Sequence, residues 1–405
     1  MVLSTSLSSL LALPVLAFFS LSARASPHPP RTPLSTAAST LKLAVRINSS
    51  GVKNIAGADR ARVRDLQAGR SSSISATNAA TIYTADVGVG SPATYYTLLI
   101  DTGSSNTWIK DKAYKKTSTS QDTGGKFSIT YGSGSVSGEE YTDIVTLNSD
   151  LVIEKQSIGV ASKSTGLDGL DGLLGVGPVY LTQGTVSNVD EVPTVTDNLY
   201  TQGTIGSEVL GVFFAPASSG DSSGELTFGS YDASKITGDI NYVPITSTSP
   251  ASGYWGIDQS IAYGTTSILT ETAGIVDTGT TLILIATDAF RKYQSATGGT
   301  PDEATGLLKI TSDQYNQLSS LYFTIGGVTY ELTPNGQIWP RSLNSAIGGT
   351  TDGIYLVVGD IGSNSGSGLD FINGYCFLER FYSVYDTTNS RVGFSTTEYT
   401  YATSN

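Results

Sequence analysis

Residues 98–108 read LLIDTGSSNTW, and residues 274–284 read GIVDTGTTLIL. In each stretch aliphatic residues lead into Asp-Thr-Gly and then Ser or Thr, so Asp101 and Asp277 hold the same position in two copies of one pattern. The second aspartate follows the first by 176 residues. A single repeat at so long a period indicates a duplicated lobe rather than a solenoid.

A second pair of segments supports the duplication. DGLLGVG at 171–177 has a looser counterpart in DFINGYCF at 370–377. Short β-type runs separated by Gly/Ser/Thr turns fill the chain from about residue 80, which is typical of an all-β body. Helical candidates in this body are few and short, such as 287–294 and 312–321. We therefore expect two related β-lobes, at 71–248 and 249–405.

The Asp-Thr-Gly loops have a direct physical interpretation. Aspartate is rarely buried without a partner, and glycine lets the main chain approach a carboxylate closely because it has no Cβ. We expect the hydroxyls that follow to hydrogen-bond the outer carboxylate oxygens, and the two Thr hydroxyls to tie one loop to the other. One such loop alone is more often a simple turn. The expected supporting residues are Thr102, Gly103, Ser104, Thr278, Gly279 and Thr280.

Composition excludes several classes of protein. Only 14% of the 405 residues are charged, against about 25% in typical domains. The single cysteine, Cys376, allows no intrachain disulfide, and we expect it to be a buried small hydrophobe. The single histidine, His28, lies near the N-terminus, so Ser-His-Asp and Cys-His catalysis and His-ligated zinc are excluded from the body. We expect no metal and no cofactor.

The N-terminal 70 residues differ from the rest. They hold nine Lys/Arg and two acidic residues, whereas the remainder holds 14 basic and 33 acidic residues. The acidic body argues against a nucleic-acid partner. The apolar run at 10–21 is shorter than the ~20 residues that span a bilayer, and Ala23-Arg24-Ala25 fits a cleavage site. We interpret 1–25 as a secretory signal peptide; a buried N-terminal helix is the alternative.

Residues 26–70 are Pro-rich and then basic, which favours a pro-segment outside the core; a flexible basic arm is the alternative. The only N-glycosylation sequon, at Asn48, falls in this segment. A basic pro-segment can block an acidic cleft at neutral pH, and acid weakens that attraction. We expect release at low pH with a cut near residues 68–75. Lys53 and Arg46 are among the candidates to lie nearest the two aspartates, and the sequence does not choose between them.

Over residues 75–405 the chain resembles the pepsin family of aspartic proteases, in particular the secreted fungal, polyporopepsin-like enzymes. The resemblance includes FLERFYSVYDTTNSRVGFS at 377–395. It implies a bilobal all-β fold with a cleft, in which Asp101 and Asp277 meet and share a proton. It also implies a secreted, monomeric acid endopeptidase that cuts polypeptides by general acid–base catalysis through water and is made as a zymogen.

KFSITYGSGSVSG at 126–138 resembles the flap of that family, with Tyr131, Gly132 and Ser133 at its tip. The resemblance implies that Tyr131 closes over substrate and that Trp108 hydrogen-bonds its hydroxyl; an ordinary strand tyrosine and a core tryptophan are the alternative. Ser133 stands where some members have Asp, so hydrophobic or aromatic residues before the cut are expected. Tyr254 could either line the cleft or pack structurally.

Two features depart from the family. Phe371-Ile372-Asn373-Gly374 stands where the family has Leu before Gly, which puts local packing behind Asp277 in question, and the disulfides of animal members are absent. Two other classes of protein are alternatives. One is a binding protein or inhibitor that keeps the fold without catalysis, and the other is a β-rich glycoside hydrolase with two carboxylates.

Overall fold

The computed structural model describes residues 39–47, 54–68, 81–131, 134–165, 167, 169–219 and 223–405. The signal peptide expected at 1–25, the sequon at Asn48 and Lys53 lie outside these residues, as do most of the residues around the expected cut. Within the described part, no helix is long and apolar enough to cross a membrane.

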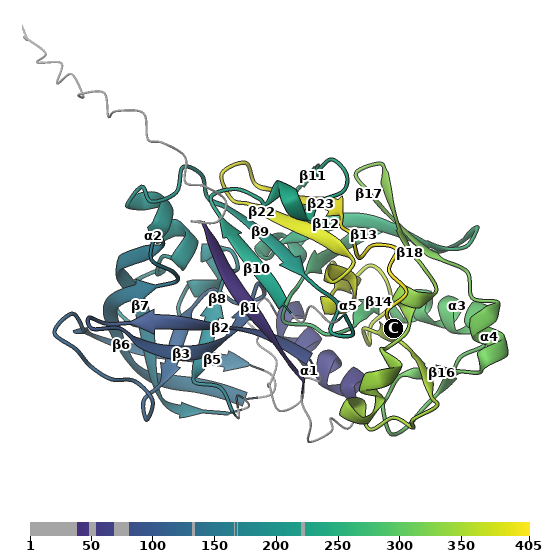
Figure 1. The fold of residues 1–405 in the computed structure, drawn as a ribbon, viewed down its shortest axis with the longest axis horizontal. Coiled ribbons are helices and arrows are strands. Elements are labelled where there is room, and N and C mark those ends of the chain that lie inside the picture. The colour runs from purple at the N-terminus through teal and green to yellow at the C-terminus, as the bar shows by residue number, and fades with distance from the viewer. Residues whose placement is uncertain are drawn as a thin grey trace, which may run out of the picture. The chain divides into compact units, whose positions relative to one another are not determined.

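Strands dominate the described residues, which confirms the prediction of an all-β fold. Thirteen of the described strands form one sheet, in which β22 and β23 from the end of the chain pair beside β9 (Figure 1). The sheet thus includes strands from both expected lobes, and the boundary between the lobes stays a prediction. In order across the sheet the strands are β11 (Asn241–Pro244), β23 (Arg391–Thr396), β22 (Phe381–Asp386), β9 (Val209–Phe214), β10 (Ser223–Phe228), β1 (Thr40–Ile47), β2 (Thr81–Val89), β3 (Thr94–Asp101), β8 (Gly172–Gly175), β4 (Thr107–Lys110), β7 (Val152–Ser164), β6 (Gly134–Thr146) and β5 (Gln121–Tyr131).

Two smaller sheets belong to the second half. The larger contains β18 (Val328–Leu332), β17 (Leu321–Ile325), β12 (Gly256–Tyr263), β13 (Thr266–Val276), β21 (Phe371–Asn373), β14 (Ile283–Ile285) and β20 (Val358–Asp360). The smaller contains β15 (Thr300–Pro301), β16 (Leu308–Ile310) and β19 (Ile354–Leu356).

Helices in the described residues are short. Of the two expected in the body, one extends to Thr297 and the other already ends at Asn316. The α-helices are α1 (Ile55–Gln67), α2 (Val195–Thr201), α3 (Thr287–Thr297), α4 (Ser312–Asn316) and α5 (Tyr375–Leu378). Short 3-10 helices lie at Val179–Thr182, Ala233–Lys235, Ala251–Gly253, Asn335–Gln337 and Arg341–Ile347.

The two Asp-Thr-Gly loops are built by the same strand arrangement. β3 runs parallel to β8, and β8 pairs antiparallel with β4. β13 likewise runs parallel to β21, and β21 pairs antiparallel with β14. The predicted correspondence between 171–177 and 370–377 is therefore confirmed. A Cβ added at Gly175 would lie 2.6 Å from the Ser105 carbonyl carbon, and one at Gly374 2.6 Å from Thr280 O, so both elements need glycine beside the loop.

Asn373 explains the departure before Gly374. It is fully buried, and its side chain exchanges two hydrogen bonds with Gln259, at 2.8 and 3.1 Å. Its main-chain oxygen accepts the Asp277 N–H at 3.1 Å. A buried amide is tolerated when its donors and acceptors are paired. The packing behind Asp277 is therefore intact, because a polar pair fills the place expected for leucine.

The described parts of 26–70 are integrated into the fold, so the expectation that this segment lies outside the core is wrong for them. β1 pairs with both β10 and β2. Its residues alternate, with Leu41 and Leu43 buried. Helix α1 buries Ile55, Val63 and Leu66. In the sequence of α1 the arginines lie between these apolar residues, so its basic composition gave no sign of an apolar face.

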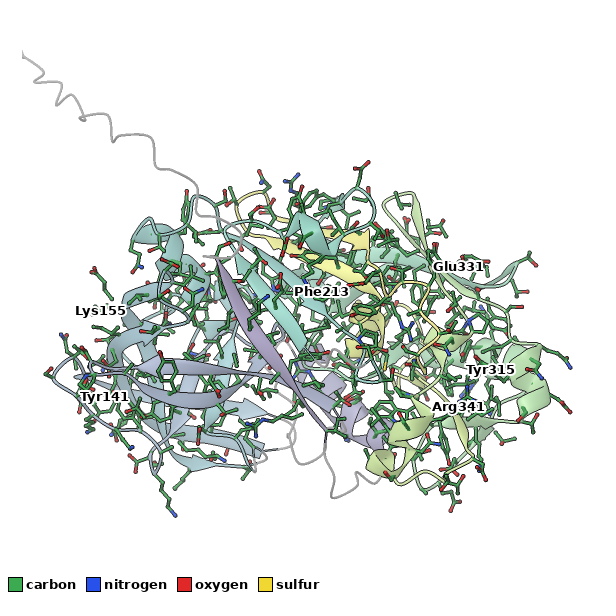
Figure 2. The ribbon with its side chains drawn as sticks, in the orientation of Figure 1. Tyr141, Lys155, Phe213, Tyr315, Glu331 and Arg341 are labelled. Carbon is green, nitrogen blue, oxygen red and sulfur yellow. The ribbon has the colours of Figure 1, made fainter. Side chains whose placement is uncertain are left out.

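Apolar clusters lie on both sides of the main sheet. Phe213, labelled in Figure 2, belongs to a small core with Tyr382 and Val384. Trp108 lies in another small core with Phe127 and is fully buried. The free Cys376 is buried in the large core, as expected.

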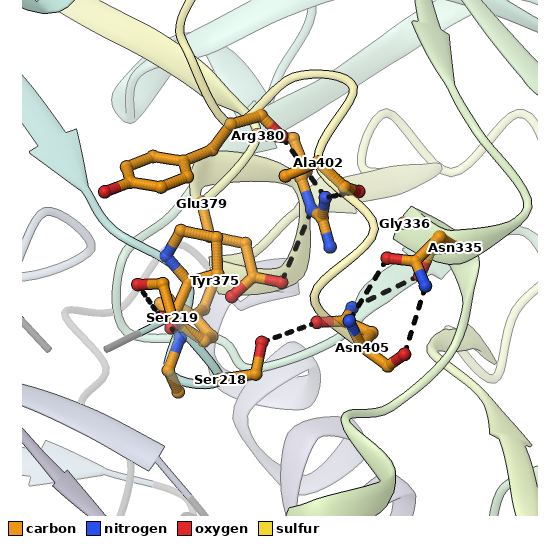
Figure 3. Close-up of polar contacts among 12 residues, drawn as sticks. Ser218, Ser219, Asn335, Gly336, Tyr375, Glu379, Arg380, Ala402 and Asn405 are labelled. Carbon is orange, nitrogen blue, oxygen red and sulfur yellow. Dashed lines mark hydrogen bonds and ion pairs between the residues drawn. The ribbon is translucent and has the colours of Figure 1, made fainter. Parts of the chain in front are cut away.

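A buried ion pair follows α5 (Figure 3). Arg380 is fully buried, and its Nε lies 3.8 Å from a carboxylate oxygen of Glu379. Its Nη1 donates to Tyr399 O at 3.2 Å and Ala402 O at 2.7 Å. Burial raises the pKa of Glu379, while Arg380 opposes this. A buried charge persists only when such partners are present.

The same region joins distant segments. Ser218 Oγ donates to Asn405 Oδ1 at 2.9 Å, and Asn405 Nδ2 donates to Asn335 O at 3.2 Å (Figure 3). The end of the described chain is thus tied both to the segment after β9 and to the turn after β18.

Candidate active site

Asp101 and Asp277 are fully buried and are held by matching hydrogen bonds. Asp101 Oδ2 accepts from Ser104 Oγ at 2.7 Å, and its Oδ1 accepts from Gly103 N at 2.9 Å. Asp277 Oδ2 accepts from Thr280 Oγ1 at 2.6 Å, and its Oδ1 accepts from Gly279 N at 3.0 Å. The hydrogen bonds expected from the repeated sequence are therefore present in both loops.

Thr102 and Thr278 join the loops. The main-chain N–H of each donates to the hydroxyl of the other, at 3.0 and 2.9 Å. The glycines lie at the closest approach of the two loops. A Cβ on Gly103 would lie 2.7 Å from Asp277 Oδ1, and one on Gly279 would collide with Asp101 Oδ1. Each glycine thus makes room for the carboxylate of the opposite loop.

A third residue, Arg62 of α1, binds both carboxylates. Its Nε donates to Asp277 Oδ2 at 2.8 Å. Its Nη2 donates to Asp101 Oδ1 at 2.8 Å and to Asp277 Oδ1 at 2.9 Å. Arg62 is 2% exposed, so this contact is closed to solvent. Sequence reasoning expected the carboxylates to be each other's partner; in this structure one guanidinium lies against both.

The sequence did not single out Arg62. Arg46 lies exposed on β1, and Lys53 lies outside the described residues. The signal was helical spacing in ADRARVRDLQ, because Asp59, Arg62 and Asp65 recur every three residues beside the buried Val63 and Leu66. That spacing becomes informative only once the segment is known to be a helix.

The site shifts the acidity of its members. Burial raises the pKa of Asp101, and Asp277 adds to this effect, while Arg62 opposes it. Burial alone would lower the pKa of Arg62, but the two adjacent carboxylates raise it above its ordinary value. Close carboxylates cannot both ionise cheaply without a cation. Here Arg62 supplies that cation.

A cavity of about 280 Å³ is lined by residues 180–181 and by residues between 249 and 254. Tyr254 is 2% exposed and lines this cavity, and its hydroxyl donates to Leu66 O at 3.2 Å. Tyr254 therefore packs in the core, and because neither aspartate lines this cavity, a place for Tyr254 in the cleft stays a prediction. The other lining residues are Tyr180, Leu181, Ser249, Pro250, Ser252 and Gly253.

The expected flap is a hairpin of β5 and β6, and Tyr131 pairs with Gly134 as its last register position. Gly132, Ser133 and the side chain of Tyr131 lie outside the described residues. Contact between Tyr131 and Trp108 therefore stays a prediction. Among the described residues, no group of His, Cys, Asp and Glu side chains could hold a metal ion.

Residues 82–397 match the family model described as eukaryotic aspartyl protease. The chain is 65% identical over 338 residues to polyporopepsin from Irpex lacteus, covering 82% of this chain and 99% of that protein. It is 32% identical over 333 residues to cathepsin E from Rattus norvegicus, covering 77% of this chain and 79% of that protein.

A solved structure has a similar fold. The crystal structure of the aspartic proteinase from Irpex lacteus matches with a TM-score of 0.77 at 66% identity, covering 80% of this chain and 96% of that one. The expectation of a bilobal, pepsin-like fold is confirmed.

Proposed function

Because the chain belongs to the eukaryotic aspartyl protease family and is thus an aspartic endopeptidase acting on polypeptides, we propose that Asp101 and Asp277 are its catalytic pair. The assignment rules out the glycoside hydrolase alternative. In the proposed mechanism the pair carries one proton. A water between the carboxylates loses a proton to the ionised member as its oxygen attacks the scissile carbonyl. The protonated member hydrogen-bonds the carbonyl oxygen, and a proton then passes to the departing amine.

One observation carries this proposal: both carboxylates face a single buried guanidinium, at 2.8 Å each. Two acidic groups that share one small cation are close enough to share one substrate. Their matching bonds to Ser104 and Thr280 hold them rigidly, which favours acid–base work at a fixed geometry. We assign the shared proton to the pair and not to one residue.

We further propose that the enzyme is made as a secreted precursor in which residues 26–70 block the site. Arg62 is the central inhibitory residue, because it occupies the carboxylates that a substrate and its water would need. Helix α1 supports it by burying Ile55, Val63 and Leu66. Release at low pH and a cut near 68–75 are part of this proposal, as are export directed by residues 1–25 and a monomeric product.

The flap part of the proposal concerns Tyr131, Gly132 and Ser133, which would close over the substrate. Gly-rich turn chemistry between two paired strands supports a hairpin that can open and close. Hydrophobic or aromatic residues before the cut are proposed, since Ser133 offers no charge to bind a lysine.

The test expresses the full chain at neutral pH and then acidifies it. Wild type should shorten and then cleave denatured casein with an acidic pH optimum. Asp101→Asn and Asp277→Asn should each lose about 10²–10⁴-fold or more in kcat after removal of the pro-segment by an added protease. Asp143→Asn is the matched control, because Asp143 is equally buried and hydrogen-bonded but lies elsewhere, between Tyr114 and Ser120. Equal losses in all three variants would overturn the catalytic assignment.

A further inference from the structure

Asp59 is a second polar anchor of α1, one turn before Arg62. It is 1% exposed, and its Oδ2 accepts the main-chain N–H of Leu282 at 2.8 Å. Leu282 follows the second Asp-Thr-Gly loop and is itself fully buried. The contact therefore places a carboxyl group of the pro-segment deep in the second half, away from solvent, and Arg62 alone does not account for it.

The charges around this contact do not balance. Asp59, Asp101 and Asp277 are each at most 1% exposed, and the cation among them is Arg62. With all three acids ionised, the buried cluster would carry two uncompensated negative charges. Burying a charge without a partner costs several kcal/mol, and a carboxyl in that position usually takes up a proton instead. The shared proton proposed for the catalytic pair removes one of these charges, so the docked cluster must take up at least one further proton to become neutral.

We propose that the main-chain amide of Leu282 is a docking site for a neutral carboxyl group, which Asp59 occupies in its protonated form, so that docking of the pro-segment takes up a proton. This inference rests on the proposed inhibitory role of the segment. The Asp59 and Arg62 contacts then respond to acid in opposite directions. Acid weakens the attraction between Arg62 and the carboxylates, whereas acid strengthens the Asp59 anchor.

The surroundings of Asp59 support this sign. Burial raises its pKa to about 7, while the N–H groups of Leu282 and Thr281 and the charge of Arg62 oppose the rise, and Asp277 adds to it. From α5 it is faced by the Cys376 thiol, whose own pKa burial holds well above its usual range, so the thiol is uncharged.

The pH window follows from linkage. The ordinary pKa of the aspartate is 3.8, and the docked value is about 7. Because the docked pKa is the higher one, the contribution of Asp59 to docking is complete below about 4 and is lost as the pH rises toward 7. Between these limits the docking constant should change by about tenfold per pH unit. Asp59 thus holds the precursor closed in mild acid, and opening waits for protonation of the pair that Arg62 binds.

The experiment measures how often α1 opens in the full-length chain. Amides of residues 55–67 are labelled by brief pulses of hydrogen exchange at pH 5, 6 and 7. The intact mass selects uncut molecules, and rates are corrected for intrinsic exchange. The opening constant of wild type is divided by that of Asp59→Asn, which keeps an acceptor for Leu282 N–H but does not titrate. The ratio should rise about tenfold per pH unit. Asp150→Asn, at an exposed aspartate, should give a ratio independent of pH.

A second variant, Asp59→Ala, controls for the case in which Asp59→Asn does not fold correctly. Asp59→Ala removes the acceptor, so α1 should open more at every pH, yet wild type divided by this variant should rise with the same slope. A flat ratio for both variants, with α1 still protected, would overturn the role of Asp59 and leave inhibition by Arg62 standing. An unprotected α1 in wild type at every pH would instead overturn the proposed inhibitory segment itself.

Discussion

Thr102 and Thr278 exchange hydrogen bonds, each main-chain N–H donating to the other hydroxyl at 3.0 and 2.9 Å. This reciprocal pair joins the two loops that present Asp101 and Asp277. Because both members come from the same position of a repeated sequence, one interaction made twice fixes the distance between the two acids.

Removing one hydroxyl should loosen this junction. Thr102→Val leaves the Thr278 N–H without an acceptor, and an unpaired buried donor costs about 1–3 kcal/mol. We expect that loss in the free energy of unfolding by urea, together with a lower kcat. Thr329→Val is the control, since Thr329 lies in an exposed cross-strand threonine pair. A variant with full stability and activity would show that the junction is dispensable.

Arg62 should keep the precursor silent. In Arg62→Ala the full-length chain should hydrolyse a fluorogenic peptide before any shortening, because the carboxylates are no longer occupied. Arg62→Lys should be intermediate, since an ammonium lacks the planar fork that makes these three bonds. Arg64, on the same helix but exposed, supplies the matched control as Arg64→Ala. Latency that survives in Arg62→Ala would assign inhibition to other parts of the segment.

Salt should not mimic the loss of Arg62. Surface ion pairs weaken as ionic strength rises, whereas buried pairs are screened much less. The Arg62 contacts are at most 2% exposed. Raising NaCl from about 0.1 to 1 M at neutral pH, where the Debye length falls from ~10 to ~3 Å, should leave the latent fraction unchanged. Activity that climbs with salt would place the dominant attraction at the surface of the segment.

Asn373 and Gln259 should behave as a coupled pair. Asn373→Leu, which restores the residue expected for the family, leaves the Gln259 amide buried and unpaired and should cost about 1–3 kcal/mol of stability. Adding Gln259→Met should recover most of that loss, because two apolar groups then replace two polar ones. A double-mutant cycle of urea unfolding measures the coupling. Additive effects would mean that the amides do not depend on each other.

Glu140 should make the protein less stable above neutral pH. It is 2% exposed on β6, and burial raises its pKa to about 7, while the Ser157 hydroxyl opposes the rise. The ordinary value is 4.5, so the neutral acid favours the folded state and its contribution is lost as pH rises from 4.5 to 7. Glu140→Gln should therefore add stability on the order of 3 kcal/mol at pH 8 and little at pH 4. Parallel urea curves at both pH values check this, and an equal gain at both would contradict it.

Much of the site could be read from the sequence because its rules are local. Gly103, Ser104 and their counterparts lie within three residues of the aspartates, so their hydrogen bonds depend on one turn and on glycine's missing Cβ. Strand alternation and turn residues were enough for the all-β class. One Asp-Thr-Gly loop alone was weak evidence for an active site, and the second copy at the same position of the repeat made that evidence strong.

The segment at 39–68 could not be predicted correctly from local sequence patterns. Its composition suggested a pro-segment outside the core, yet β1 pairs on both edges and α1 buries Ile55 and Leu66. Asn373 was similarly read as a departure, because its partner Gln259 stands 114 residues away. Interactions over such separations leave no local pattern.

Sequence alone determined the two acid-bearing loops, since a buried strand, an aspartate, a glycine and a hydroxyl suffice to build each one. Tertiary structure decided which cation meets them. Arg46, Lys53 and Arg62 are chemically similar, and only the rotation and docking of α1 bring the guanidinium of Arg62 to 2.8 Å from both carboxylates. The physical reason is that a turn is governed by neighbours in the chain, whereas the partner of a buried charge is governed by packing between distant segments.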